Sequence, residues 1–201
     1  MSHEQIYPIF GDFWQITKMT KAQNVIAQAD KIFKQDLRIQ NTKKEKLIVG
    51  CFNSAISHHQ AITLLLSHGM DISALSLMRS LNEALIRGYW LLYCANDNDV
   101  SDFGKRKFLF GKDKKVNLKT FLTNHDTEHN NKHLYSFIDS HNEEYHDFTH
   151  CGKELSEFAF DIDDLHDEEI ARHFNNANKI ASFAIEGLQI LTQSNINSII
   201  E

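Results

Sequence analysis

The sequence contains very little proline or glycine, with one proline and eight glycines in 201 residues. Both residues interrupt regular elements and mark turns, so their scarcity argues against a β-rich or multidomain chain. Leucine, lysine, glutamate and alanine instead dominate long periodic segments. We therefore predict an all-α fold, formed by one domain over residues 1–201.

Cysteine is also scarce. The three cysteines, Cys51, Cys94 and Cys151, are an odd number and none belongs to a C-x-x-C pair. This pattern predicts free thiols in a reducing compartment. No apolar run approaches the roughly 20 residues that a membrane-spanning helix needs, and the first ten residues lack a charged segment followed by an apolar core. We expect a cytoplasmic protein without a membrane partner.

Several motifs of catalysis and nucleotide binding are missing. The chain has no Gly-x-Ser-x-Gly, no Walker-type loop and no dinucleotide-binding glycine loop. Cys151 adjoins His150, but sequence neighbours on a helix point in different directions. We therefore predict no cofactor, and whether the protein is an enzyme stays open.

Hydrophobic periodicity predicts a helical bundle of four long helices. The long helices are expected from about Phe13 or Thr20 to Ile39, from Lys44 to Ser67, from Asp71 to Ala95, and from about His166 to Ile199. Two or three shorter helices, over about 99–110, 115–124 and 134–148, are inserted before the last long helix.

The helix from Asp71 to Ala95 has apolar residues around more than half of its surface, so we expect it to be packed on several sides. Gly69 suits the left-handed end of the preceding helix, and Asp71 suits an N-cap. The remaining strip carries Arg79, Glu83 and Arg87 at i, i+4 and i+8.

That strip has two interpretations. If the strip is a solvated face, each of its ion pairs would contribute only a few tenths of a kcal/mol to stability. The apolar residues Ile72, Trp90 and Cys94 share the strip, however, and would then also be exposed. We therefore favour a partly buried polar row, which needs polar partners from another helix.

Residues 145–152 are the best source of such partners. His146 and His150 lie at i and i+4, and Tyr145 and Thr149 form the neighbouring row. Their side chains can hydrogen-bond charged groups across a bundle, where they either fix helix register or form a pocket. The candidate catalytic residues are Arg79, Glu83, His146 and His150, and the candidate pocket residues are Arg87, Tyr145 and Thr149.

The motifs Arg79-x3-Glu83-x3-Arg87-x2-Trp90 and Tyr145-x3-Thr149-His150-x-Gly152 resemble those of a broad group of uncharacterised bacterial all-helical proteins. The likeness covers mainly residues 70–105 and 140–152. That group is similar in turn to the HEPN superfamily of helical bundles, many of which are RNA-cleaving toxins or phage-defence effectors. The HEPN signature is an arginine followed four to six residues later by a histidine, which this chain lacks after Arg79 and Arg87.

We expect a homodimer that acts by binding a protein partner, because the polar row lacks a complete catalytic signature. The resemblance suggests a toxin–antitoxin, immunity or phage-defence setting for it. The alternative that it implies is a divergent HEPN-like ribonuclease, with Arg79 for phosphate and His146 or His150 for acid–base chemistry.

Metal binding is a second alternative. His125, His129 and His133 are spaced i, i+4 and i+8, and His146 and His150 with His58 or His59 would make a three-histidine site. Glu143-x-x-His146 is half of a di-iron pattern, which needs two such pairs. Because twelve histidines make chance spacings common, we assign no metal ligand.

The net charge of −6 conceals a basic cluster over 105–119 and an acidic stretch over 143–169. With Phe108 and Phe110 the basic cluster could bind nucleic acid, but we favour a solvated face with the phenylalanines turned inward. The acidic stretch would suit a basic partner protein.

Overall fold

The computed structural model describes residues 12–34, 40–103, 112–124 and 167–200, with the single residues Leu134, Ser136, Phe137, Ser140 and Tyr145. Over these residues every regular element is a helix, which confirms the all-α prediction. The long helices are α1 (Asp12–Lys34), α2 (Lys43–Ser67), α4 (Met78–Tyr93) and α9 (Asp167–Ile200). The shorter ones are α3 (Asp71–Ser76), α5 (Asp97–Phe103) and α6 (Lys112–Asn124).

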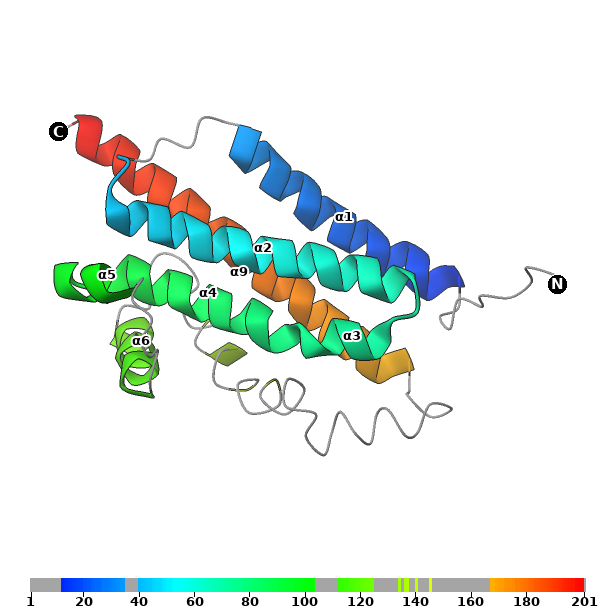
Figure 1. Cartoon of the computed structure of the whole chain (residues 1–201). Coiled ribbons are helices and arrows are strands. Elements are labelled where there is room, and N and C mark those ends of the chain that lie inside the picture. Colours follow the sequence, from blue (N-terminus) through cyan, green and yellow to red (C-terminus); the bar gives the residue numbers. More distant parts are fainter. Residues whose placement is uncertain are drawn as a thin grey trace.

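The long helices form the predicted bundle. Helix α9 packs against α1, α2 and α4, and α2 packs most extensively against α4 (Figure 1). Helix α3 leads into α4, and α6 lies against the later part of α4. In the part of the chain that is described, no helix is both long and apolar enough to cross a membrane.

The helix predicted from Asp71 to Ala95 is divided at Leu77. The Leu77 amide donates to the Ala74 carbonyl at 3.1 Å, an i−3 bond that tightens this turn and separates α3 from α4. Gly69 has the expected left-handed conformation, with φ of 68°. The N-cap prediction for Asp71 was wrong: the Met70 carbonyl accepts from the Ala74 amide, so α3 begins with Asp71 and Met70 is its cap.

The centre of the core is the ring of Phe52 on α2, which lies between Gly88 on α4 and Gly187 on α9. A Cβ added at either glycine would come within 3.0 Å of three carbons of that ring. Tyr89 meets the Phe52 ring edge-on at 5.2 Å, and its hydroxyl donates to the Phe183 carbonyl at 2.8 Å. Close approach at two glycines therefore fixes the packing of three helices around one aromatic ring.

A polar pair also lies inside the bundle. His59 on α2 is fully buried, and its Nε2 lies 2.8 Å from Oδ1 of Asn178 on α9. Its ring stacks over Phe174 at 6.5 Å. Burial lowers the pKa of His59, and the hydrogen bond to Asn178 opposes that shift.

Helix α6 is attached to α4 and α5 by Lys114. The ammonium of Lys114 lies 4.8 Å from the centroid of the Trp90 ring and 3.1 Å from Oδ1 of Asp99. The rings of Tyr93 and Phe121 stack at 4.7 Å in the same interface. These contacts cover the part of the α4 strip that contains Trp90, which is 1% exposed.

Candidate binding pocket between α2 and α4

The charged row on α4 is a continuous chain of ion pairs. Glu83 accepts a hydrogen bond from Nε of Arg79 at 2.8 Å and another from Nη2 of Arg87 at 2.9 Å. The side chains of Arg79 and Glu83 are each 27% exposed, and that of Arg87 is 42% exposed. The row is therefore partly buried, and the central carboxylate holds both guanidiniums in fixed positions.

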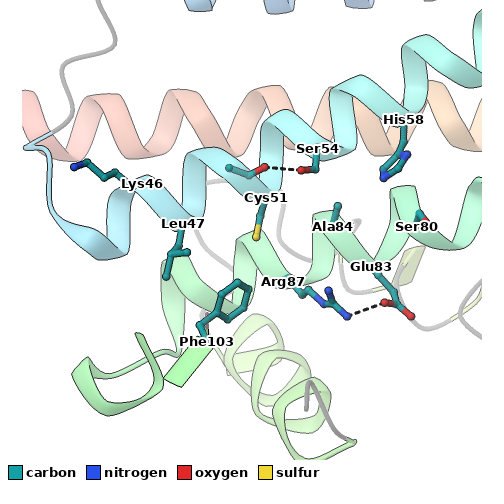
Figure 2. A pocket seen from close by; sticks show the side chains of 11 residues that line it. Lys46, Leu47, Cys51, Ser54, His58, Ser80, Glu83, Ala84, Arg87 and Phe103 are labelled. Carbon is teal, nitrogen blue, oxygen red and sulfur yellow. Dashed lines mark hydrogen bonds and ion pairs between the residues drawn. The ribbon is translucent and has the colours of Figure 1, made fainter. Parts of the chain in front are cut away.

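The row borders a pocket of about 490 Å³ between α2 and α4 (Figure 2). This volume lies within the range of small-molecule sites. The residues that line the pocket come from α2, α4 and α5, and are Lys46, Leu47, Gly50, Cys51, Ser54, His58, Ser80, Glu83, Ala84, Arg87 and Phe103.

The two ends of the pocket differ in polarity. Leu47 and Phe103 lie together at one end, next to α5 (Figure 2). His58, Ser80 and Glu83 lie toward the other end, and Arg87 lies between them and the apolar end. The pocket can therefore accommodate a ligand that has both an apolar part and a charged part.

Among the described residues, the imidazole that lines this pocket with the row is His58 of α2. Its side chain points toward α4, where Ser80 and Glu83 lie (Figure 2). Partial burial lowers the pKa of His58, so the ring is neutral at pH 7 and can either donate or accept a hydrogen bond.

Of the remaining predicted site residues, only Tyr145 belongs to the described part of the chain. Tyr145 is buried, but its ring packs edge-on against His173 of α9, with centroids 6.3 Å apart, and is not part of the pocket lining. His146, Thr149 and His150 lie outside the described residues. Their place in the site therefore stays a prediction, and among the described residues the pocket lining includes the imidazole of His58 from α2.

Helix α6 supplies a further charge to the row. The ammonium of Lys115 interacts electrostatically with Glu83, Arg79 and Arg87. Its pKa is lowered, first by partial burial and then by the neighbouring cations, while Glu83 opposes the shift. The expectation of a fully solvated basic face was therefore wrong for Lys114 and Lys115, because the aromatic contacts of α6 hold this helix against α4.

The thiol in the pocket is not activated. Burial raises the pKa of Cys51 to about 11, although Arg87 opposes this shift. Cys51 is therefore protonated at neutral pH, and only the thiolate is a good nucleophile or metal ligand. Over the described residues, no three His, Cys, Asp or Glu side chains are grouped to hold a metal ion. The predicted histidine series 125, 129 and 133 lies outside those residues.

Sequence reasoning missed the contribution of α2 to the site. Lys46, Gly50, Ser54 and His58 recur every four residues and form one helical stripe beside Leu47 and Cys51. This spacing along one face of α2 is the signal that could have identified it.

A family model that is described as "Family of unknown function (DUF6988)" matches residues 52–198. The match includes all of α4 and α5, and the part of α2 that carries Ser54 and His58. No curated protein and no solved structure gives a significant match.

Proposed function

The chain belongs to the DUF6988 family of unknown function, and we propose that this member acts by binding a partner protein through the pocket between α2 and α4. In this proposal an acidic group of the partner enters the pocket beside Arg87. The resemblance of the sequence to helical toxin and defence proteins supports a toxin–antitoxin, immunity or phage-defence setting, with the protein acting as a cytoplasmic homodimer.

The observation that carries the proposal is the position of Arg87 in the pocket wall. Glu83 forms ion pairs with Arg79 and Arg87, and Lys115 of α6 interacts with the same row. A guanidinium at a partly buried site attracts an anionic group, and water screens that attraction less than it does at an exposed site. Arg87 lines the pocket and is the most exposed member of the row, so it is the side chain that the partner would contact.

Binding is favoured over catalysis by the state of the reactive groups. The thiol of Cys51 is protonated at neutral pH, and the carboxylate of Glu83 is already held by two guanidiniums. Neither group is therefore prepared to act as a nucleophile or a general base.

Co-purification tests this proposal. The tagged chain is expressed at its native level, and proteins recovered with the wild type are compared with those recovered with Arg87→Glu. Lys179→Glu is the control, because Lys179 is an exposed cation on α9 and does not line the pocket. We expect a partner that binds the wild type and Lys179→Glu but not Arg87→Glu. The proposal is contradicted if no partner is recovered, or if a partner binds the wild type, Arg87→Glu and Lys179→Glu equally well.

A divergent ribonuclease is the second candidate, because His58 lines the same pocket as Glu83 and Arg87. Arg79 or Arg87 would bind phosphate, and His58 would take the acid–base role that the sequence assigned to His146 or His150. Cleavage of total RNA by the purified protein, lost in His58→Gln or His150→Ala with the fold intact, would support it. Intact RNA together with normal growth on expression excludes it.

A further inference from the structure

We propose that the part of the partner protein that occupies the pocket between α2 and α4 is an acidic amphipathic helix. Its apolar side chains would pack against Leu47 and Phe103, and one of its carboxylates would lie beside Lys46. The inference rests on the proposed function, because it names the segment of the partner that enters the same pocket.

The pocket is elongated and runs along the helix axes. Its wall on α2 extends from Lys46 to His58, twelve positions that rise about 18 Å along the helix. The opposite wall extends from Ser80 to Arg87 of α4 and continues to Phe103 of α5 (Figure 2). A helix of about three turns has this length and is roughly 10 Å across. One face of such a helix, but not the whole helix, fits a cavity of about 490 Å³.

Small side chains line the middle of the pocket on both walls. Gly50 and Ser54 come from α2, and Ala84 comes from α4. A Cβ added at Gly50 would meet no other described part of the protein within 4 Å, so the pocket is open above this residue. Packed helices have their axes about 8–10 Å apart, depending on the side chains at the contact. A third helix can therefore approach α2 and α4 closely here.

The walls of the pocket favour a helix over an extended segment. Both walls are helices, whose backbone groups are already hydrogen-bonded along the helix. The hydroxyl of Ser54 likewise donates to the Gly50 carbonyl of its own helix, at 2.8 Å. An extended peptide would bury backbone N–H and C=O groups against walls that offer only side chains as partners, which costs free energy. A helix satisfies these groups itself and presents only side chains to the pocket.

The cations in the lining determine the charge of the occupant. Lys46 is exposed beside Leu47 and, among the described residues, forms no ion pair. Arg87, the second cation that lines the pocket, is paired with Glu83. A carboxylate of the partner can therefore pair with Lys46, and a second one can share Arg87 with Glu83, because a guanidinium has five N–H donors.

The positions of the two cations also predict a spacing in the partner. Arg87 is close enough to Cys51 to affect the pKa of its thiol. Cys51 follows Lys46 by five positions, a rise of about 7.5 Å along α2. Carboxylates that reach both cations from one helix are therefore about one turn apart, at i and i+4 or i+5.

Photo-crosslinking in cells tests the inference on the whole chain. The photoreactive residue p-benzoylphenylalanine replaces Gly50 or His58, and mass spectrometry identifies the partner residues that each position captures. These two positions are eight residues apart, about 12 Å along α2. The captured residues should be about six to ten positions apart on a helix, but only about three to five apart on an extended segment. The same photoreactive residue at Lys179, an exposed position on α9 outside the pocket, should capture no partner.

Substitutions test the acidic and helical character of the captured segment, with affinities measured by calorimetry on the purified proteins. Lys46→Glu should weaken binding about tenfold or more, and a lysine in place of the partner's acidic residue nearest the site captured from position 50 should restore it. The control Lys179→Glu should have no effect. Proline in the middle of the captured segment should weaken binding about tenfold or more, whereas alanine at the same position should change it less than about twofold. Circular dichroism shows first that each variant of this chain keeps the wild-type helix content.

Three results overturn the inference. They are a partner that co-purifies but is captured from neither Gly50 nor His58, captured residues with the extended spacing, and an unchanged affinity in Lys46→Glu. A partner that depends on Arg87 but is captured with the extended spacing leaves the proposed function intact. A partner captured with the helical spacing that binds Arg87→Glu as tightly as the wild type overturns the proposed contact with Arg87 alone. A small molecule found on the purified chain by native mass spectrometry, without any captured protein, overturns both.

Discussion

The ring of Phe52 on α2 lies directly against the backbone of Gly88 on α4. A methyl group at position 88 would come within 3.0 Å of three ring carbons, a separation that real side chains essentially never show. Because Gly187 of α9 approaches the same ring from its own helix, the ring has no room to move away. The packing of α2 against α4, which positions both walls of the pocket, therefore depends on the absence of a side chain at Gly88.

Gly88→Ala should destabilise the protein. Overpacking of a core costs about 1–3 kcal/mol, and the higher helix propensity of alanine relative to glycine offsets only about 1 kcal/mol of this cost. Gly50→Ala is the matched control, because a Cβ there meets nothing within 4 Å and should stabilise α2 by about 0.5–1 kcal/mol. The free energy of unfolding in urea measures both. Equal effects of the two substitutions would show that Phe52 does not restrict position 88.

His59→Gln should make stability less dependent on pH. The pKa of His59 is below 6.5 in the folded protein and returns to about 6.5 on unfolding, so the unfolded chain binds more protons. Stability is therefore complete above pH 6.5 and falls as the pH drops from 6.5 through the folded pKa. We expect the loss of Tm between pH 8 and pH 5.5 to be smaller in the variant than in the wild type.

His58→Gln provides the comparison for this experiment, because partial burial lowers the pKa of His58 in the same direction. A wild-type pH dependence in both variants would show that neither imidazole controls acid stability.

Glu83→Gln should destabilise the protein by about 1 kcal/mol at low salt. It removes two half-buried ion pairs, each worth about 0.2–1 kcal/mol, and leaves Arg79, Arg87 and Lys115 to repel one another. Because salt screens this repulsion, the destabilisation should be smaller in 1 M NaCl. Urea unfolding at both salt concentrations measures it. Glu169→Gln breaks only an exposed pair with Arg172 and should cost less.

The thiol of Cys51 should react slowly with an aromatic disulfide reagent at pH 8, because its pKa is about 11 and the thiolate is scarce. Arg87 opposes that shift, so Arg87→Gln should slow the reaction further. The measurement uses a variant in which Cys94 and Cys151 are replaced by serine. Reaction at the rate of a free cysteine would place the thiol in a more polar setting than the pocket wall.

The periodicity of apolar residues was sufficient to predict the long helices, because burial on one or more sides of a helix leaves a repeating pattern. It could not predict the break at Leu77. Leu77 fits the helical period of apolar residues, and the break arises because its amide donates to the Ala74 carbonyl, three residues earlier. Likewise, Asp71 has the chemistry of an N-cap, but the turn that includes Gly69 places the cap one residue earlier.

The candidate site was predictable only in part. The spacing of Arg79, Glu83 and Arg87 indicated the ion pairs that the structure contains, because residues four apart on a helix are neighbours. What faces the row depends on the packing of distant segments. Lys115 reaches it only because α6 folds back on α4, and His58 because α2 presents one stripe toward α4.

The ring of Phe52 on α2 packs against both α4 and α9, so substitutions in these three helices are not independent of one another. Any bulk gained at Gly88 or Gly187 requires atoms to be removed from position 52, and a smaller residue at position 52 leaves a void that only larger neighbours can fill. Substitutions in α2, α4 and α9 are thus coupled through a fixed volume. At this level the three segments evolve as one unit, although more than a hundred residues separate the first from the last.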